Sequence, residues 1–600
     1  MNQNTIPNRK DVPQNDKWNL SSLYENDEQW EKDLKQIPSL TKKVLAFKGR
    51  LSESSDVFLD ALKSLQDLSL KIETVYHYSS LLQSADANDA SANDKYGRAM
   101  MEYTKMASEI SFFNPEMQAI EESKLNEWKN LPEFADFKIY IEKSLYLKKY
   151  ILSEKEERIL NLQNQTAQTS YEAFEALTNV DMNKTFGSVK IGQKDLQLTQ
   201  TTFSIFMENQ DRKIREEAYK KFYAKFEENQ HVIAALYAGS VNQDVFYAQA
   251  KGYSSSLEAA LYSNKVPVSV YKNLIECVHK NLGTLHEYYA LRKKVLGLDK
   301  LKHYDVYVPL VKSVETKTSY DEAVEICRNA LSPLGKEYTD RLCEGLKNGW
   351  VDRYENVGKR SGAFSSGCYV GNPYILLNYK EDAIRDVFTM AHEGGHSMHS
   401  WYSVHNNPFM SYDYTIFEAE VASTFNEALV FEYLLKNAKT KEMKAYLLSM
   451  RASDILATLH RQTMFAEFEL KTHEMVESGT PLTSEILRKT YRELLELYFG
   501  PDMEFEENSD LEGLRIPHFY TAFYVYKYAT GISAALALAK KVLNGGEKER
   551  EDYFKFLKSG GSRYPIESLK VAGVNMESVE PIQDACDEFK KIIDELKIIL

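Results

Sequence analysis

The stretch DAIRDVFTMAHEGGHSMHSW, residues 382–401, carries the clearest helical pattern of the chain. Its apolar residues recur every three or four positions, which predicts one amphipathic helix; they are Ile384, Val387, Phe388 and Ala391. Gly394 and Gly395 lie inside this predicted helix, where each glycine costs about 1 kcal/mol relative to alanine. A helix that keeps both glycines indicates close approach of another backbone or of a substrate.

Two histidines of this stretch, His392 and His396, are four residues apart. On an α-helix that spacing places both imidazoles on one face, where their ring nitrogens can bind one zinc ion at about 2.0–2.1 Å. Glu393 projects about 100° away around the helix, so it can reach a water molecule on the metal without binding the metal itself. The pattern therefore predicts a zinc site with Glu393 as general base. The alternative is a solvated, histidine-rich helix.

A catalytic zinc site needs a third protein ligand and one open position. His399 follows His392 by seven residues, about 10.5 Å along the helix axis, so we expect it either to lie behind the metal ligands or to face the cleft, and not to bind the ion. The segment FEAEVASTFNE, residues 417–427, has a helical pattern that places Glu420 and Glu427 on one side. We expect Glu420 to be the third ligand and Glu427 to orient a ligand histidine by a hydrogen bond.

The segment IPHFYTAFYVYKYATG, residues 516–531, is rich in aromatic side chains. Tyr520, Tyr524 and Tyr528 recur every four residues, which predicts one stripe along a helix. Such a stripe is typical of a packed core. Beside a zinc site, however, His518 and one tyrosine become candidate hydrogen-bond donors to a developing oxyanion.

Helical spacing of apolar residues predicts helices through most of the chain. One example is Thr480–Pro501, and another is the C-terminal stripe Phe589, Ile592, Ile593 and Leu596. Strands are predicted only for a hairpin within residues 186–200 and for YILLNY, residues 374–379. We expect an N-terminal helical domain, residues 1–200, followed by a catalytic domain, residues 201–600.

The composition restricts the class of protein. The 600 residues carry a net charge of −14, whereas nucleic-acid-binding proteins concentrate positive charge to meet phosphates. The polar start lacks the pattern of a secretion signal, and no apolar stretch approaches the roughly 18 residues of a membrane span. We therefore expect a cytoplasmic protein that binds neither nucleic acid nor membrane. The five cysteines are scattered, which argues against a thiolate zinc site, and the oligomeric state stays unknown.

Three of these segments, at 392–399, 417–427 and 516–531, together resemble the thimet-type oligopeptidases, the M3 zinc metallopeptidases, and in particular their oligoendopeptidase F branch. RSGAFSSG at 360–367 and Trp18-Asn19-Leu20 also fit that branch. The resemblance covers nearly the whole chain. It implies a mostly α-helical, two-lobed fold with a deep internal channel and a few short strands. It also implies one zinc ion per chain and endopeptidase activity on short oligopeptides.

The resemblance assigns roles to single residues. The zinc ligands it implies are His392, His396 and Glu420, and the catalytic residues are Glu393, His518 and Tyr524. Tyr524 fits the family pattern only with a gap of one residue after His518. Tyr528 and His399 are expected to contact the substrate.

The expected reaction is hydrolysis of an internal peptide bond by a metal-activated water, with Glu393 as the general base. The strand YILLNY is expected to add an extended peptide to its edge. One alternative is a zinc hydrolase that cuts a non-peptide amide. Another is a helical peptide-binding or chaperone-like protein whose metal is structural, but a structural zinc site has four protein ligands and this sequence offers three good ones.

Overall fold

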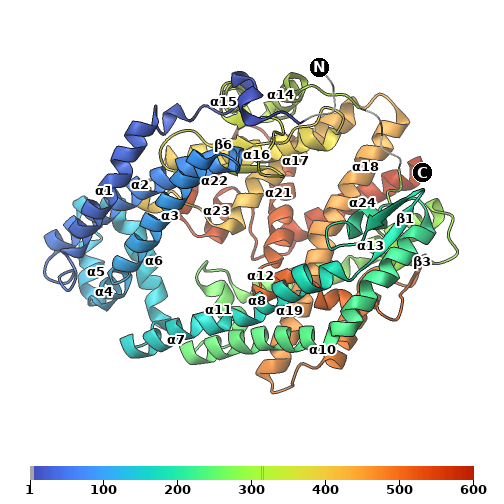
Figure 1. The fold of residues 1–600 in the computed structure, drawn as a ribbon, viewed down its shortest axis with the longest axis horizontal. Coiled ribbons are helices and arrows are strands. Elements are labelled where there is room, and N and C mark those ends of the chain that lie inside the picture. The colour runs from blue at the N-terminus through green and yellow to red at the C-terminus, as the bar shows by residue number, and fades with distance from the viewer. Residues whose placement is uncertain (1–5, 312–313, 315) are drawn as a thin grey trace. The chain divides into compact units, whose positions relative to one another are not determined.

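The protein is described by a computed structural model in which residues 6–311, 314 and 316–600 are placed. Most of these residues lie in helices, with a few short strands between them (Figure 1), so the mostly helical fold is confirmed. The chain forms two compact units of three segments each. Unit 1 contains Met1–Lys149, Glu315–Lys436 and Leu538–Val574, and unit 2 contains Tyr150–Val314, Asn437–Ala537 and Asn575–Leu600. The expected domain boundary near residue 200 divides the chain into two consecutive regions, whereas each unit here is built from three separate segments. That boundary and the internal channel both stay predictions.

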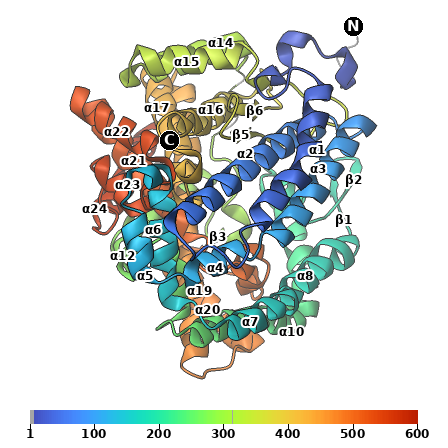
Figure 2. The same cartoon turned by 90° about the vertical axis from the view of Figure 1, so that its left-hand side faces the viewer.

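Unit 1 begins with three long helices that lie side by side in both views (Figures 1 and 2): α1 Asp27–Leu45, α2 Ser55–Ala85 and α3 Ala90–Glu109. The side chain before each helix, Asn26, Ser54 or Asp89, accepts a hydrogen bond from the first turn, which is the usual N-cap. The other helices lying wholly or almost wholly in unit 1 are α4 Phe113–Ala119, α5 Glu122–Trp128, α6 Lys138–Leu147, α14 Tyr320–Ala330, α15 Lys336–Lys347, α16 Ile384–Val404, α17 Ile416–Asn437, α22 Glu547–Ser559 and α23 Pro565–Val571.

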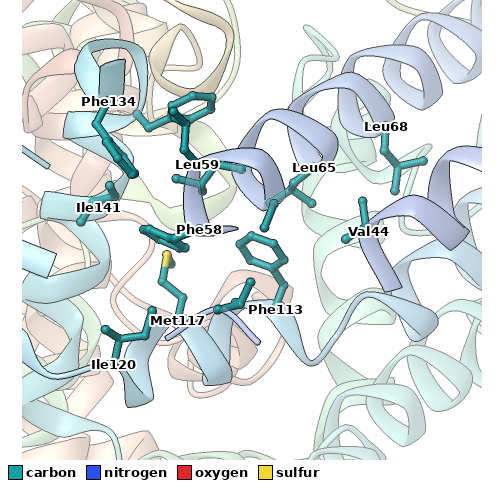
Figure 3. Packing of buried hydrophobic residues seen from close by; sticks show 14 of the residues in the cluster. Val44, Phe58, Leu59, Leu65, Leu68, Phe113, Met117, Ile120, Phe134 and Ile141 are labelled. Atoms are coloured by element: carbon teal, nitrogen blue, oxygen red, sulfur yellow. The ribbon is translucent and has the colours of Figure 1, made fainter. Parts of the chain in front are cut away.

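The hydrophobic core of this helical region gathers around Phe58 of α2 (Figure 3). Phe58 is fully buried, and its ring lies 5.9 Å from the ring of Phe134 and 5.7 Å from that of Trp128. Met117 and Ile141 fill the same cluster. Burying one such large apolar side chain contributes about 1.5–3 kcal/mol, so this cluster holds α2 against α4, α5 and α6.

Unit 1 also contains a three-stranded sheet with the order β4-β6-β5. Strand β6 (Tyr374–Leu376) pairs parallel with β4 (Val351–Asp352) and antiparallel with β5 (Phe364–Ser366). The strand predicted over YILLNY is therefore confirmed. The prediction that its edge receives a peptide is wrong, because β4 and β5 occupy both edges of β6. The outer edge of β5 is the edge of the sheet that lies next to α16, the helix that contains His392 and His396.

The N-terminal segment packs on this sheet through Trp18 and Asn19. The buried Trp18 ring lies 6.5 Å from Phe364 of β5 and 6.2 Å from Tyr374 of β6. The Tyr374 hydroxyl donates a hydrogen bond of 2.8 Å to the backbone oxygen of Asn19. The motif Trp18-Asn19-Leu20 thus supports the two strands that lie nearest to α16.

Unit 2 confirms the other local predictions. Strands β1 (Ser188–Ile191) and β2 (Lys194–Gln197) form the predicted hairpin. Helix α20 (Ser484–Phe499) lies within the predicted helical stretch Thr480–Pro501, and the Thr483 side chain caps its start. The buried face of α24 (Glu580–Ile599) includes the predicted C-terminal stripe. No helix in the described part of the chain is long and apolar enough to cross a membrane.

Unit 2 contains most of the remaining helices and two further short strands. Helix α21, Tyr526–Asn544, has residues in both units. The other α-helices and strands of unit 2 are α7 Glu154–Ala167, α8 Thr169–Glu175, α9 Phe203–Met207, α10 Arg212–Lys251, α11 Ser256–Tyr262, α12 Val268–Lys280, α13 Leu282–Val295, β3 Leu301–Lys302, α18 Lys441–Ile455, α19 Gln462–Glu477 and β7 Met503–Glu504.

Candidate metal centre

Helices α16 and α17 carry the predicted metal-binding residues and pack against each other at Gly395. A Cβ atom at this glycine would lie 2.6 Å from the backbone oxygen of Ala422 and 2.7 Å from the Cα of Ser423. Only a glycine therefore allows the two backbones to come this close. At Gly394 the nearest atom to such a Cβ is the flexible end of the Leu342 side chain, at 3.0 Å. The two glycines thus have different roles, and only Gly395 brings the second helix to the histidines.

Three side chains that can bind a metal meet where these helices pack. The Nε2 atoms of His392 and His396 lie 3.2 Å apart, and the Oε2 atom of Glu420 lies 3.5 Å from the first and 3.8 Å from the second. Among the described residues these three side chains form the only cluster of this kind. They remain between 16% and 38% exposed, so a ligand from outside can reach them.

These separations fit a tetrahedral zinc ion. Bonds of about 2.0–2.1 Å at tetrahedral angles place two ligand atoms about 3.3 Å apart, and the three measured distances are 3.2, 3.5 and 3.8 Å. Two imidazole nitrogens and one carboxylate are also the donor set of many catalytic zinc sites, which keep the fourth position open. The residues present therefore fit one zinc ion and one further ligand.

Neighbouring side chains orient two of the three donors, His392 and Glu420. His392 Nδ1 makes a very short contact with the carboxylate of Glu427, so its Nε2 lone pair is free to face a metal. Ser423 donates a hydrogen bond of 3.3 Å to Glu420 Oε2. Asn426 donates one of 3.1 Å to the backbone oxygen of Ala391. Glu427 meets His392 as the sequence predicts. The helical pattern also places Ser423 on the side of Glu420, but it assigned no hydrogen bond to Ser423 or Asn426.

The two histidines differ in their affinity for protons. Burial disfavours a charged His392, but the Glu427 carboxylate outweighs burial and raises the pKa of His392 to about 9. Burial, together with the charge on His392, lowers the pKa of His396 to about 3. A metal must therefore displace a proton from His392 but not from His396.

Glu393 lies beside the three donors but is not one of them. Its side chain is buried, and burial raises its pKa to about 7, although the charge on His392 opposes the rise. The backbone N–H of Ser365, in the edge strand β5, donates a hydrogen bond to this carboxylate. The Ser365 hydroxyl also lies 2.8 Å from the hydroxyl of Ser397, one turn further along α16. No sequence pattern singled out Ser365, because its contact depends on how the sheet packs against the helix.

His399 does not face an open cleft. Its ring is 1% exposed, stacks on the ring of Tyr414 at 3.7 Å and contacts Phe556 at 5.0 Å. Burial lowers its pKa to about 3. A peptide has no exposed surface of this ring to touch, so we do not retain His399 as a substrate-binding residue. The structure agrees with the prediction that His399 is absent from the ligand cluster.

The aromatic segment at 516–531 is not one helix, so the predicted tyrosine stripe is wrong. A 3₁₀ helix, Pro517–Tyr520, ends before a turn, and α21 begins only at Tyr526. Tyr520 packs on Phe174, with ring centroids 4.6 Å apart. The turn brings Tyr524 and Tyr528 to His518 instead, at ring separations of 6.3 and 6.2 Å. The three candidate residues therefore cluster, but by a different route from the predicted one.

Phe523 breaks the helical path with a positive φ of 56°. Few residues other than glycine adopt this conformation, and a bulky side chain there is strained. The backbone N–H of Phe523 donates a hydrogen bond of 2.9 Å to Glu469, whose carboxyl group is buried. Burial raises the pKa of Glu469 well above its ordinary value. A buried acid on α19 therefore holds the turn that precedes Tyr524.

Comparison with known proteins identifies the family. A model of peptidase family M3 matches residues 205–588, and a model named oligopeptidase F matches residues 116–183. The chain belongs to peptidase family M3.

Relatives of this family match the chain over nearly its whole length. It is 44% identical to an oligoendopeptidase F homolog of Borreliella burgdorferi, over 99% of both chains. It is 41% identical to the oligopeptidase PepF of Bacillus subtilis, over 100% of this chain and 89% of the other. The crystal structure of oligoendopeptidase F from Enterococcus faecium has a TM-score of 0.74 at 31% identity and covers 96% of this chain and 99% of the other.

Membership in family M3 settles the class of chemistry. The chain is a zinc metalloendopeptidase similar to oligoendopeptidase F. The resemblance seen in the three sequence segments is therefore confirmed.

Proposed function

We propose that this protein hydrolyses internal bonds of short oligopeptides with one zinc ion held by His392, His396 and Glu420. The observation that supports this proposal is the cluster of three donor atoms, with separations of 3.2–3.8 Å, next to the carboxyl group of Glu393. A structural zinc ion takes four protein ligands, and this cluster provides three. The arrangement is therefore that of a site with an open position for a reactant.

Glu393 is the proposed general base. When bound, the zinc ion acts as a Lewis acid and lowers the pKa of a coordinated water toward about 7. The Glu393 carboxylate takes a proton from the attacking water and later passes it to the leaving amine, as expected for a carboxylate within reach of the reacting atoms. The Ser365 N–H holds this carboxylate in place.

His518 and Tyr524 are the proposed donors to the oxyanion that forms on the peptide carbonyl. They belong to unit 2 and the ligand cluster to unit 1. What supports their shared role is their mutual contact, at a ring separation of 6.3 Å, and the held turn between them. Tyr528, which contacts both rings, is proposed to position the substrate.

The edge of β5 is the proposed binding surface for the peptide backbone. In an antiparallel pair, alternate residues point their N–H and C=O groups toward the partner strand. Ser365 directs its N–H to Glu393 and away from β6, so its backbone groups lie on the free edge, where its C=O can accept a hydrogen bond from a peptide N–H. An extended peptide that adds to this edge is recognised by its backbone and not by its side chains. Location in the cytoplasm and the restriction to short peptides stay predictions of the family resemblance.

The test is digestion of a mixed peptide library with zinc-loaded and chelator-treated protein, read by mass spectrometry. We expect internal cleavage that disappears with the metal and returns with added zinc. Metal analysis of Glu420→Ala should show loss of zinc, whereas His399→Phe, which keeps an aromatic ring against Tyr414, should retain it. Cleavage that survives complete zinc removal, or zinc retained in Glu420→Ala, would refute the assignment.

A further inference from the structure

The guanidinium group of Arg515 lies against aromatic rings and makes no hydrogen bond to any described residue. It lies between the 3₁₀ helix Ser509–Leu514 and the 3₁₀ helix that contains His518. No hydrogen bond or ion pair of this guanidinium occurs within residues 6–311, 314 and 316–600, and its Nε atom is buried. The group lies over two aromatic rings, 5.5 Å from the centroid of Phe203 and 5.6 Å from that of Phe222. An arginine with free donors in such a place needs an anion or water to satisfy them.

The nearest acidic group is already engaged by other residues. Glu512 Oε2 accepts hydrogen bonds from Arg461 at 2.6 Å and from the Tyr491 hydroxyl at 2.8 Å. Its other oxygen faces the Tyr307 hydroxyl at 3.5 Å. Arg461 and Glu512 thus neutralise each other, and the charge of Arg515 remains. Its neighbour His303 adds no further charge near neutral pH, because burial lowers its pKa to about 4.

Tyr307 shows that this cluster reaches the surface of the protein. Its side chain is 44% exposed, yet the protein around the phenol raises its pKa by desolvation. Arg515, which is half-buried, lies in the same cluster, since its charge acts on Tyr307 and on Glu512.

We propose that Arg515 binds a carboxylate of the peptide substrate, through the paired N–H groups of its guanidinium. The paired donors of guanidinium match the two oxygens of a carboxylate, and the guanidinium of Arg515 lies over the rings of Phe203 and Phe222. The carboxylate belongs either to the C-terminus of the peptide or to an aspartate or glutamate side chain. This inference rests on the proposed function only in that the ligand is a peptide.

The experiment measures binding without hydrolysis. In zinc-loaded protein with Glu393→Gln, fluorescence anisotropy gives the Kd of one labelled peptide in three forms. The first form has a free C-terminus, the second a C-terminal amide, and the third an amide with one internal glutamine replaced by glutamate. Each form is measured with Arg515, with Arg515→Gln and with Arg515→Lys. Arg212→Gln is the matched control, because Arg212 in the same unit is paired with Asp305 at 2.8 Å.

We expect one of the two carboxylate forms to bind about 10- to 100-fold more tightly than the plain amide, the range for a hydrogen bond to a charged group. Arg515→Gln should remove this preference and leave the Kd of the plain amide unchanged, and Arg212→Gln should keep it. Arg515→Lys keeps the charge but loses the paired donors, so it should lose part of the preference for the carboxylate form. If Arg515→Gln does not fold, the Kd values of Arg515→Lys serve as the test. Equal binding of all three forms, or equal weakening of all three by Arg515→Gln and Arg515→Lys, would overturn the proposal. Because no cleavage is measured, a failure of the proposed catalytic function would appear separately, in the peptide digestion.

Discussion

The α16–α17 centre and the segment Ile516–Gly531 were both predicted from residues four positions apart, with opposite outcomes. His392 and His396 lie on one uninterrupted helix, and their ring nitrogens meet at 3.2 Å. Tyr520 and Tyr524 have the same spacing, but a turn separates them and their rings pack on different neighbours. Spacing therefore identifies a shared face only where the backbone between the residues is helical.

The physical difference between the two regions is local strain. In α16 the two glycines lower helix propensity, but tertiary packing at Gly395 offsets this cost. Around Phe523 a buried acid holds the backbone in a positive-φ conformation that no local preference favours. Such a break depends on α19, which is distant in sequence.

The largest expected effect concerns the acid beside the metal ligands. Glu393→Gln should lower kcat for a short peptide by about 10²–10⁴-fold, because an amide cannot act as general base. Zinc content should stay at one ion per chain, since Glu393 is not a ligand. Turnover within tenfold of the wild-type enzyme, with zinc bound, would contradict the role.

The aromatic segment provides the next test. His518→Ala and Tyr524→Phe should each lower kcat by about 10²–10³-fold with little change in KM, the range for loss of one oxyanion donor. Tyr528→Phe is the control and should change KM more than kcat. The assignment of Tyr524 fails if the large loss in kcat follows Tyr528→Phe while Tyr524→Phe remains active.

Glu427 tests how the centre holds its metal. At pH 9 or above, where His392 is mostly unprotonated, Glu427→Gln should weaken zinc binding about 10- to 100-fold, since the hydrogen bond that orients His392 is weakened. Below pH 9 the wild-type affinity should fall about tenfold per pH unit, because the metal competes with a proton on His392. The variant lacks the carboxylate that raises this pKa, so its affinity should begin to fall at a lower pH. Competition with a zinc chelator measures both curves, and parallel curves would contradict this explanation.

The two glycines of α16 form a matched pair. Gly395→Ala should lower the free energy of unfolding by about 1–3 kcal/mol, because its Cβ meets the backbone of α17, and should weaken zinc binding by moving Glu420. Gly394→Ala meets only the Leu342 side chain and gains helix propensity, so it should be close to neutral. Equal effects of both substitutions in denaturant titrations would show that close approach at Gly395 is unimportant.

A last test, of similar size, concerns Glu469. Glu469→Ala should cost about 1–3 kcal/mol, because the Phe523 N–H loses its buried acceptor. Glu469→Gln keeps an acceptor and cannot ionise. The folded protein holds the Glu469 proton more tightly than the unfolded chain does, so wild-type stability should fall relative to the Gln variant as pH rises above about 4.5. Urea titrations at pH 4.5 and 7 measure the free energy of unfolding of both proteins. An increase in the stability of the wild type relative to the Gln variant with rising pH would contradict this explanation.

Local patterns were enough to predict most of the fold and the composition of the metal centre. The helices α16, α20 and α24, the hairpin and the strand β6 follow from periodicity, because apolar spacing and caps act within one element. His392, Glu393 and His396 belong to one helix, so their relative geometry was also set locally. Glu420 and Glu427 needed a second helix, whose own pattern placed them on one side, and the family resemblance supported Glu420 as the third ligand.

Tertiary packing alone decided the rest. The order β4-β6-β5 removed the edge predicted for YILLNY, and the packing of Tyr414 and Phe556 buried His399. Ser365 reaches Glu393, and Arg515 has no hydrogen-bond or ion-pair partner in the described part of the chain, only because of which elements lie beside them. The sequence by itself determined which side chains a helix or strand presents, since spacing along one element is fixed by backbone geometry. Which neighbour each side chain meets depends on contacts between residues far apart in the chain, and no local pattern records those contacts.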